Sequence, residues 1–236
     1  MEKKLGRSPV VLATVLTAGA AYLLRRVQML EQLDRTGKIM AEAGKGPLTW
    51  VSLAFVLLAA VYCLFLGKET GMKNREPVST VLTLMAAFFM ALGSAANWTS
   101  HAPVALGGIV TAVCWVVIAL QRQQDMTPSA LAFMIPALFY ALHIVIEFRD
   151  WSRDPLILDY CFALLAGLCT MCATFHLGGF SLGRGKRRVS VFYCLCGVVF
   201  CAVAMMGESL ANTVITGAGA LWLLANVWLL LGEVEA

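Results

Sequence analysis

Long apolar runs, one after another, constrain this chain more than any other feature of its sequence. A run of about 20 apolar residues is enough to cross the roughly 30 Å hydrocarbon core of a bilayer as a helix. The 236-residue chain has room for eight such runs, and its longest polar interval lies between Leu24 and Leu48. Since no interval can hold a separate soluble domain, the sequence predicts one integral membrane domain over residues 1–236.

The composition favours helices over a transmembrane barrel. Only 14% of the residues are charged, against about 25% in a typical soluble domain. The apolar runs are continuous, whereas barrel strands alternate apolar and polar residues. We therefore predict an all-α polytopic transmembrane helix bundle. The expected spans are 8–25, 48–67, 78–96, 104–120, 129–147, 156–178, 189–206 and 212–231.

Proline marks the start of five of these spans. Proline is well tolerated in the first turn of a helix, where its missing N–H has no intrahelical partner. The residues are Pro47, Pro77, Pro103, Pro128 and Pro155. The first span has the outline of a signal peptide, but its apolar run continues through residues 22–24 into further spans. We expect it to be an uncleaved first helix, with a seven-span chain as the alternative.

The distribution of Lys and Arg predicts the orientation of the bundle. Loops on the side of the two termini carry more basic residues, including the cluster at 184–188. Cytoplasmic loops are enriched in Lys and Arg, so both termini are expected in the cytoplasm. The first outer loop, with five basic residues, is the exception. We expect a bacterial-type plasma membrane and contact with the lipid bilayer. A membrane protein partner or a homo-oligomer is left open, and the basic loops are not a nucleic-acid signal.

The stretch HIVIEFRDW, residues 143–151, places two ionisable groups in an apolar span. His143 and Glu147 are four residues apart, which puts them on one face of a helix. In the predicted orientation Asp159, His101 and Glu208 reach the same outer end. Ionisable groups in membrane helices are expensive and face the bundle interior or a water-filled cavity. These five residues therefore form a predicted ligand pocket. The alternative is that they are helix-end charges and a hydrogen-bonded histidine.

A second group of candidate ligands is predicted at the cytoplasmic end. Cys169, Cys172 and His176 share one helix face, and Cys194 and Cys196 begin the next span. Soft metals such as Cu(I) and Zn prefer thiolate and imidazole ligands. The competing interpretation is stronger, because free cysteine packs as a small apolar residue and this chain has cysteines in other apolar runs as well.

Two short stretches resemble each other. GSAAN at 93–97 and GESLAN at 207–212 each open a tight helical hairpin. Repeats are common in membrane carriers, but two unrelated hairpins with polar turns is the simpler interpretation.

These patterns leave three classes of function open. The first is a membrane protein that binds or transports a small molecule or ion through the outer pocket, and this class is not enzymatic. The second is a metal-dependent intramembrane hydrolase that uses His143, Glu147 and Asp159. The third is a structural or assembly subunit. The sequence has no phosphate-binding loop and no Gly-x-Ser-x-Gly turn, and it identifies no cofactor.

Overall fold

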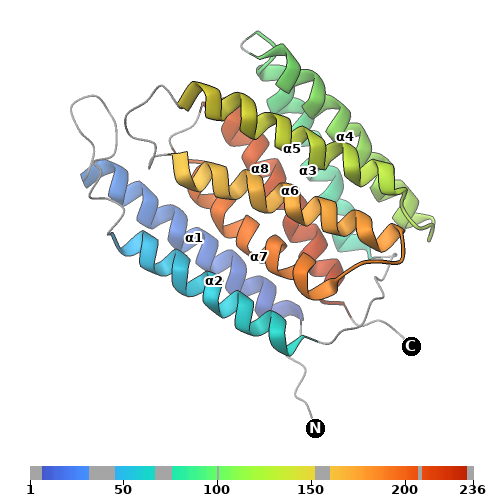
Figure 1. Cartoon of the computed structure of the whole chain (residues 1–236), viewed down its shortest axis with the longest axis horizontal. Coiled ribbons are helices and arrows are strands. Elements are labelled where there is room, and N and C mark those ends of the chain that lie inside the picture. The colour runs from blue at the N-terminus through green and yellow to red at the C-terminus, as the bar shows by residue number, and fades with distance from the viewer. Residues whose placement is uncertain are drawn as a thin grey trace.

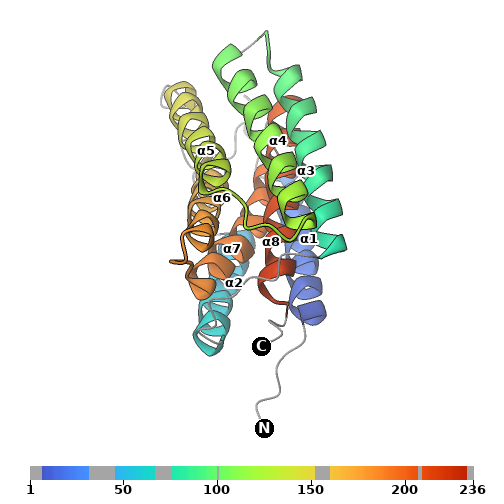
Figure 2. The same ribbon diagram turned by 90° about the vertical axis from the view of Figure 1, so that its right-hand side faces the viewer.

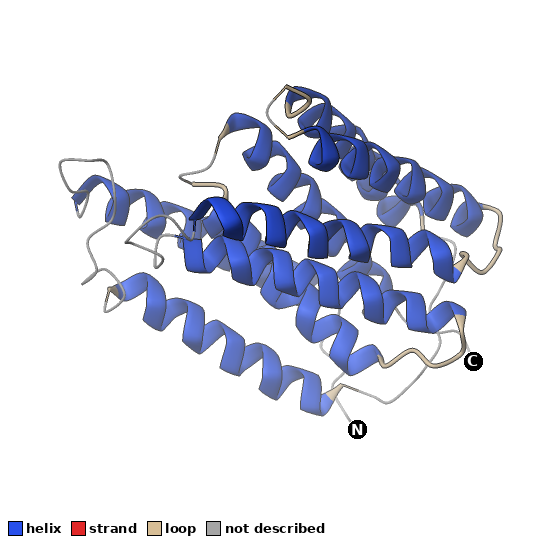
Figure 3. Cartoon of the chain, turned by 45° about the horizontal axis from the view of Figure 1, so that its top comes forward, coloured by secondary structure: helices blue, strands red, loops and turns tan. Residues whose placement is uncertain are grey.

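The described part of the chain consists of helices joined by short turns. The computed structural model describes residues 7–31, 46–66, 76–99, 101–151, 160–206 and 209–232. Within these ranges it forms eight α-helices (Figure 3). They are α1 (Arg7–Glu31), α2 (Pro47–Phe65), α3 (Pro77–Ala96), α4 (Ala102–Gln123), α5 (Ala130–Trp151), α6 (Cys161–Ser181), α7 (Arg187–Ala204) and α8 (Leu210–Leu230). The prediction of an all-helical bundle is confirmed.

Each of the eight described helices is long and apolar enough to cross a membrane. The first of these candidate spans is Ser8–Leu30, so the structure has the eight helices that the eight-span prediction requires. A chain with eight such helices is a polytopic integral membrane protein.

The helices form an antiparallel bundle in which α7 and α8 are the most enclosed. α8 packs against α3, α7 and α6, and α7 also packs against α1 and α2. Figures 1 and 2 show α1 and α2 at one edge of the bundle and the α3–α4 hairpin at the other. As an even number of spans requires, α1 begins and α8 ends at the same end of the bundle (Figure 1).

The outer helices present apolar side chains to their surroundings. On α2, Leu53, Leu57, Leu58 and Leu64 are between 49% and 68% exposed. Large apolar side chains at this density on one helix match contact with lipid tails rather than with water. The bilayer is therefore the environment that the surface of this protein fits.

α1 extends beyond the expected span 8–25 and ends at Glu31. The helix continues because Arg25 turns into the bundle, where it is 4% exposed and its Cζ lies 5.6 Å from the ring centroid of Phe162. The expected start of the sixth span, 156–159, lies outside the described residues. Of the five prolines, Pro47 and Pro77 are the first residues of α2 and α3.

Glycines bring α3, α4 and α8 into close contact. A Cβ added at Gly93 would lie 3.0 Å from the backbone oxygen of Ala211 on α8. A Cβ added at Gly108 would lie 1.9 Å from Oγ of Ser94 on α3. Small residues at such positions let membrane helices approach closely and gain dispersion contacts. This packing holds the end of α3 against the beginning of α8, where the candidate site lies.

Candidate functional site

His143 and Glu147 lie on one face of the last turns of α5, as their spacing predicts. His143 Nε2 is 3.6 Å from Glu147 Oε1, a contact that becomes an ion pair only when the imidazole is protonated. His143 is 7% exposed, and the Glu147 side chain is 13% exposed. Both side chains therefore face the interior of the bundle, where the cost of burying a charged group calls for polar partners.

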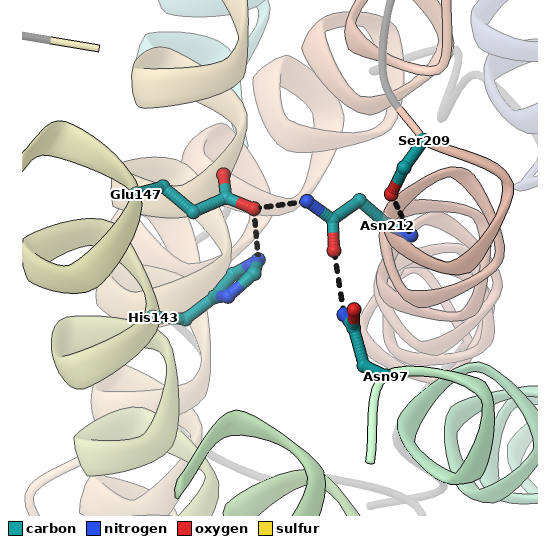
Figure 4. Close-up of polar contacts among 5 residues, drawn as sticks. All are labelled: Asn97, His143, Glu147, Ser209 and Asn212. Carbon is teal, nitrogen blue, oxygen red and sulfur yellow. Dashed lines mark hydrogen bonds and ion pairs between the residues drawn. The ribbon is translucent and has the colours of Figure 1, made fainter. Parts of the chain in front are cut away.

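Asparagines from two other helices connect to this carboxylate. Asn212, in the first turn of α8, donates a hydrogen bond from its side-chain amide to Glu147 Oε1. Asn97, the C-cap residue of α3, donates from Nδ2 to Asn212 Oδ1 over 2.7 Å. Ser209 accepts the backbone N–H of Asn212 and caps α8. Figure 4 shows these contacts. We call Asn97, His143, Glu147 and Asn212 the Glu147 network.

A small cavity adjoins the network between α5, α6, α7 and α8. Its volume, measured as the space open to the centre of a water molecule, is about 20 Å³. A single water needs roughly 10–15 Å³ by this measure, so the cavity has the size of one or two waters. The polar groups on its wall come from Tyr140, His143, Glu147, Thr170, Cys201 and Thr216.

The wall of the cavity includes polar atoms that lack a partner in the described part of the chain. Tyr140 Oη and His143 Nδ1 are buried and make no hydrogen bond there. The imidazole ring stacks on Phe139 with centroids 5.7 Å apart. The hydroxyl of Thr170 donates to the backbone oxygen of Ala166, and its oxygen lies 3.7 Å from Sγ of Cys201. The cavity is therefore lined by groups able to bind water or a small ion.

Three of the five residues of the predicted ligand pocket lie within the part of the chain that the structure describes. His101, the residue before α4, lies within electrostatic range of His143. Asp159 and Glu208 lie outside the described residues. Whether these five residues form one ligand pocket therefore stays a prediction.

The predicted metal site of thiols and His176 also stays a prediction. Cys194 and Cys196 are buried in α7, whereas Cys169 and Cys172 are partly exposed on α6. Cys169 packs closely against α7, since a Cβ added at Gly197 would lie 3.3 Å from Cys169 Cβ. The ring of His176 stacks on Tyr193. Among the described residues, no three His, Cys, Asp or Glu side chains are placed to hold one metal ion. The visible contacts of these side chains are packing contacts.

Sequence reasoning missed Asn97 and Asn212 as site residues. The available signal was the resemblance of GSAAN to GESLAN, since these two asparagines end the two stretches and contact each other in the fold. It also missed Tyr140 and Thr170, because a single hydroxyl in an apolar span has no distinctive spacing.

No protein-family model, curated protein or solved structure matches the chain.

Proposed function

We propose that the protein binds a small monovalent cation at Glu147 and transports it across the membrane. The observation that supports this most directly is the Glu147 carboxylate, which is mostly enclosed by the bundle and lies beside a cavity of water size. The Asn212 amide donates a hydrogen bond to this carboxylate. A carboxyl group in the interior of a membrane protein is costly and marks a candidate ion or ligand site.

The size of the cavity favours an ion over an organic molecule. Sites for small organic ligands have volumes of roughly 300–1,000 Å³, and the cavity beside Glu147 has the size of one or two waters. Dehydrated alkali cations are about as large as a water molecule. Of the ligands that the sequence leaves open, an ion therefore fits this conformation best.

The chemistry of the wall favours a cation. Hard cations prefer carboxylate, hydroxyl and water oxygens. The cavity offers the carboxylate of Glu147 and the hydroxyls of Tyr140, Thr170 and Thr216. In the orientation that the basic loops predict, this end of the bundle faces the cell exterior, and transport would begin with a cation entering there.

The test compares thermal unfolding of the detergent-purified protein in NaCl and in choline chloride. At constant chloride, only the cation changes. A ligand at 100 times its Kd raises the Tm of a protein of this size on the order of 5 °C. We expect a saturable rise with Na⁺ in the wild type and none in Glu147→Gln.

The matched control is Glu76→Gln, which neutralises another buried carboxyl, just before α3 at the other end of that helix. This variant should keep the response to Na⁺. Equal Tm values in both salts, or a response that survives in Glu147→Gln, would contradict the proposal.

A further inference from the structure

A second buried charge lies toward the opposite end of the bundle from the Glu147 network. Arg122, in the last turn of α4, is 2% exposed. Its Nη2 donates to Asn226 Oδ1 over 2.9 Å, and Asn226 Nδ2 donates to the backbone oxygen of Trp222 over 2.7 Å. Asn226 and Asn212 are separated by about 20 Å along α8 at 1.5 Å per residue. The two charged regions are therefore separate sites.

Aromatic rings surround the guanidinium. Its Cζ lies 5.8 Å from the ring centroids of both Phe133 and Trp222. Trp115 stacks on Trp222 with centroids 4.9 Å apart. The faces of aromatic rings attract a cation, which offsets part of the cost of taking Arg122 out of water. The rings supply no acceptor for N–H groups in the guanidinium plane.

Several N–H donors in this region have no acceptor. In the described part of the chain, Nε and Nη1 of Arg122 and Nε1 of Trp115 are buried without a hydrogen-bond partner. Trp115 and Arg122 both contact Trp222. No carboxylate among the described residues pairs with Arg122. A buried unpaired charge and unsatisfied donors are each costly, and such groups in a native protein call for an unseen ligand or water.

We propose that Arg122 and Trp115 form an internal binding site for a small monovalent anion, with chloride as its simplest occupant. The unmatched groups are all donors, and two of them belong to the charged guanidinium of Arg122. Water would satisfy the donors but leave the charge uncompensated, whereas an anion does both. The rings of Phe133 and Trp222 and the amide of Asn226 occupy other sides of the guanidinium, which favours a halide over a larger organic anion.

The proposal is independent of the cation site and is tested with a different ion. Thermal unfolding is compared in NaCl and sodium gluconate, so that Na⁺ stays constant and only the anion changes. We expect chloride to raise the Tm in a saturable way, on the order of 5 °C at 100 times its Kd. Arg122→Gln should lose this response. Arg26→Gln, which removes an exposed arginine from α1, should keep it.

A direct measurement covers the case in which Arg122→Gln does not fold. Binding of radioactive chloride to the wild type should saturate at one ion per chain. Trp115→Phe removes a single N–H donor and keeps an aromatic ring, so its affinity for chloride should fall about 3–10-fold. No saturable chloride binding by the wild type, or unchanged binding in Trp115→Phe together with an unchanged response in Arg122→Gln, overturns the proposal.

Discussion

At the scale of single residues, Glu147 joins three parts of the bundle through one carboxylate oxygen. Oε1 accepts the amide of Asn212 and contacts the imidazole of His143, and Asn212 in turn accepts from Asn97. The chain of contacts runs from α5 through α8 to the end of α3. A buried polar network that joins helices in this way favours one arrangement of those helices, because breaking it leaves further buried groups unpaired.

The first prediction concerns the two asparagines. Asn212→Ala removes the donor to Glu147 and the acceptor for Asn97, so we expect it to lower the free energy of unfolding by about 1–2 kcal/mol. Asn97→Ala should cost about 0.5–1 kcal/mol. Because both remove the same hydrogen bond, the double variant should be less destabilised than the sum of the two. Unfolding titrations in denaturing detergent measure all three, and strictly additive values would show that the asparagines do not interact.

The second prediction concerns transition metals at His143. The cation proposal predicts no stoichiometric zinc, copper or iron in the purified protein, which elemental mass spectrometry measures directly. A stoichiometric metal that is lost in His143→Ala would instead favour the metal-dependent hydrolase. Loss only in Cys172→Ala would assign the metal to the predicted thiol group.

At the residue scale, the sequence could predict which residues share a face of one helix, but not which residues of different helices contact each other. The spacing of His143 and Glu147 places them on one helix face whatever the rest of the fold does. The pairing of Asn97 with Asn212 depends on how α3 packs against α8, across 115 positions of chain. The spacing of residues within one helix does not show which residues of distant helices come into contact. The cavity formed by four helices could not be predicted for the same reason.

At the scale of elements, apolar length and proline placement made the helices predictable. The ends of the helices were harder to predict, because a polar residue near the end of a span can either leave the membrane or point its side chain into the bundle. Arg25 turns inward and α1 continues, and Arg122 does the same in the last turn of α4. Whether a charged side chain is buried depends on neighbouring helices, which the sequence of one helix does not show.

The third prediction tests close packing between helices. Gly93→Ala and Gly108→Ala each place a methyl group in contact with α8 or α3 at distances that require displacement. We expect each to lower the free energy of unfolding by about 1–3 kcal/mol. Gly19→Ala is the control, because no atom lies within 4 Å of its added Cβ. Alanine is also the better helix former, so this variant should be neutral or more stable by up to about 1 kcal/mol. A loss of stability in Gly19→Ala as large as in the other two would contradict the packing account.

At the scale of the whole molecule, eight antiparallel spans require both termini on one side of the membrane. The distribution of Lys and Arg predicts that this side is the cytoplasm. In that predicted orientation, the Glu147 network would lie toward the exterior and Arg122 toward the cytoplasm.

The fourth prediction is the orientation itself. A cytoplasmically active reporter fused to the C-terminus should be active, and one that works only outside the cytoplasm should be silent. The opposite pattern would reverse the bundle and move the Glu147 network to the inner face.

Equilibrium binding of radioactive Na⁺ to the purified protein measures whether Glu147 holds a cation. We expect saturable binding of one Na⁺ per chain in the wild type and in Glu76→Gln, with no saturable binding in folded Glu147→Gln. Binding that is absent from the wild type, or equal in Glu147→Gln, would contradict the cation proposal.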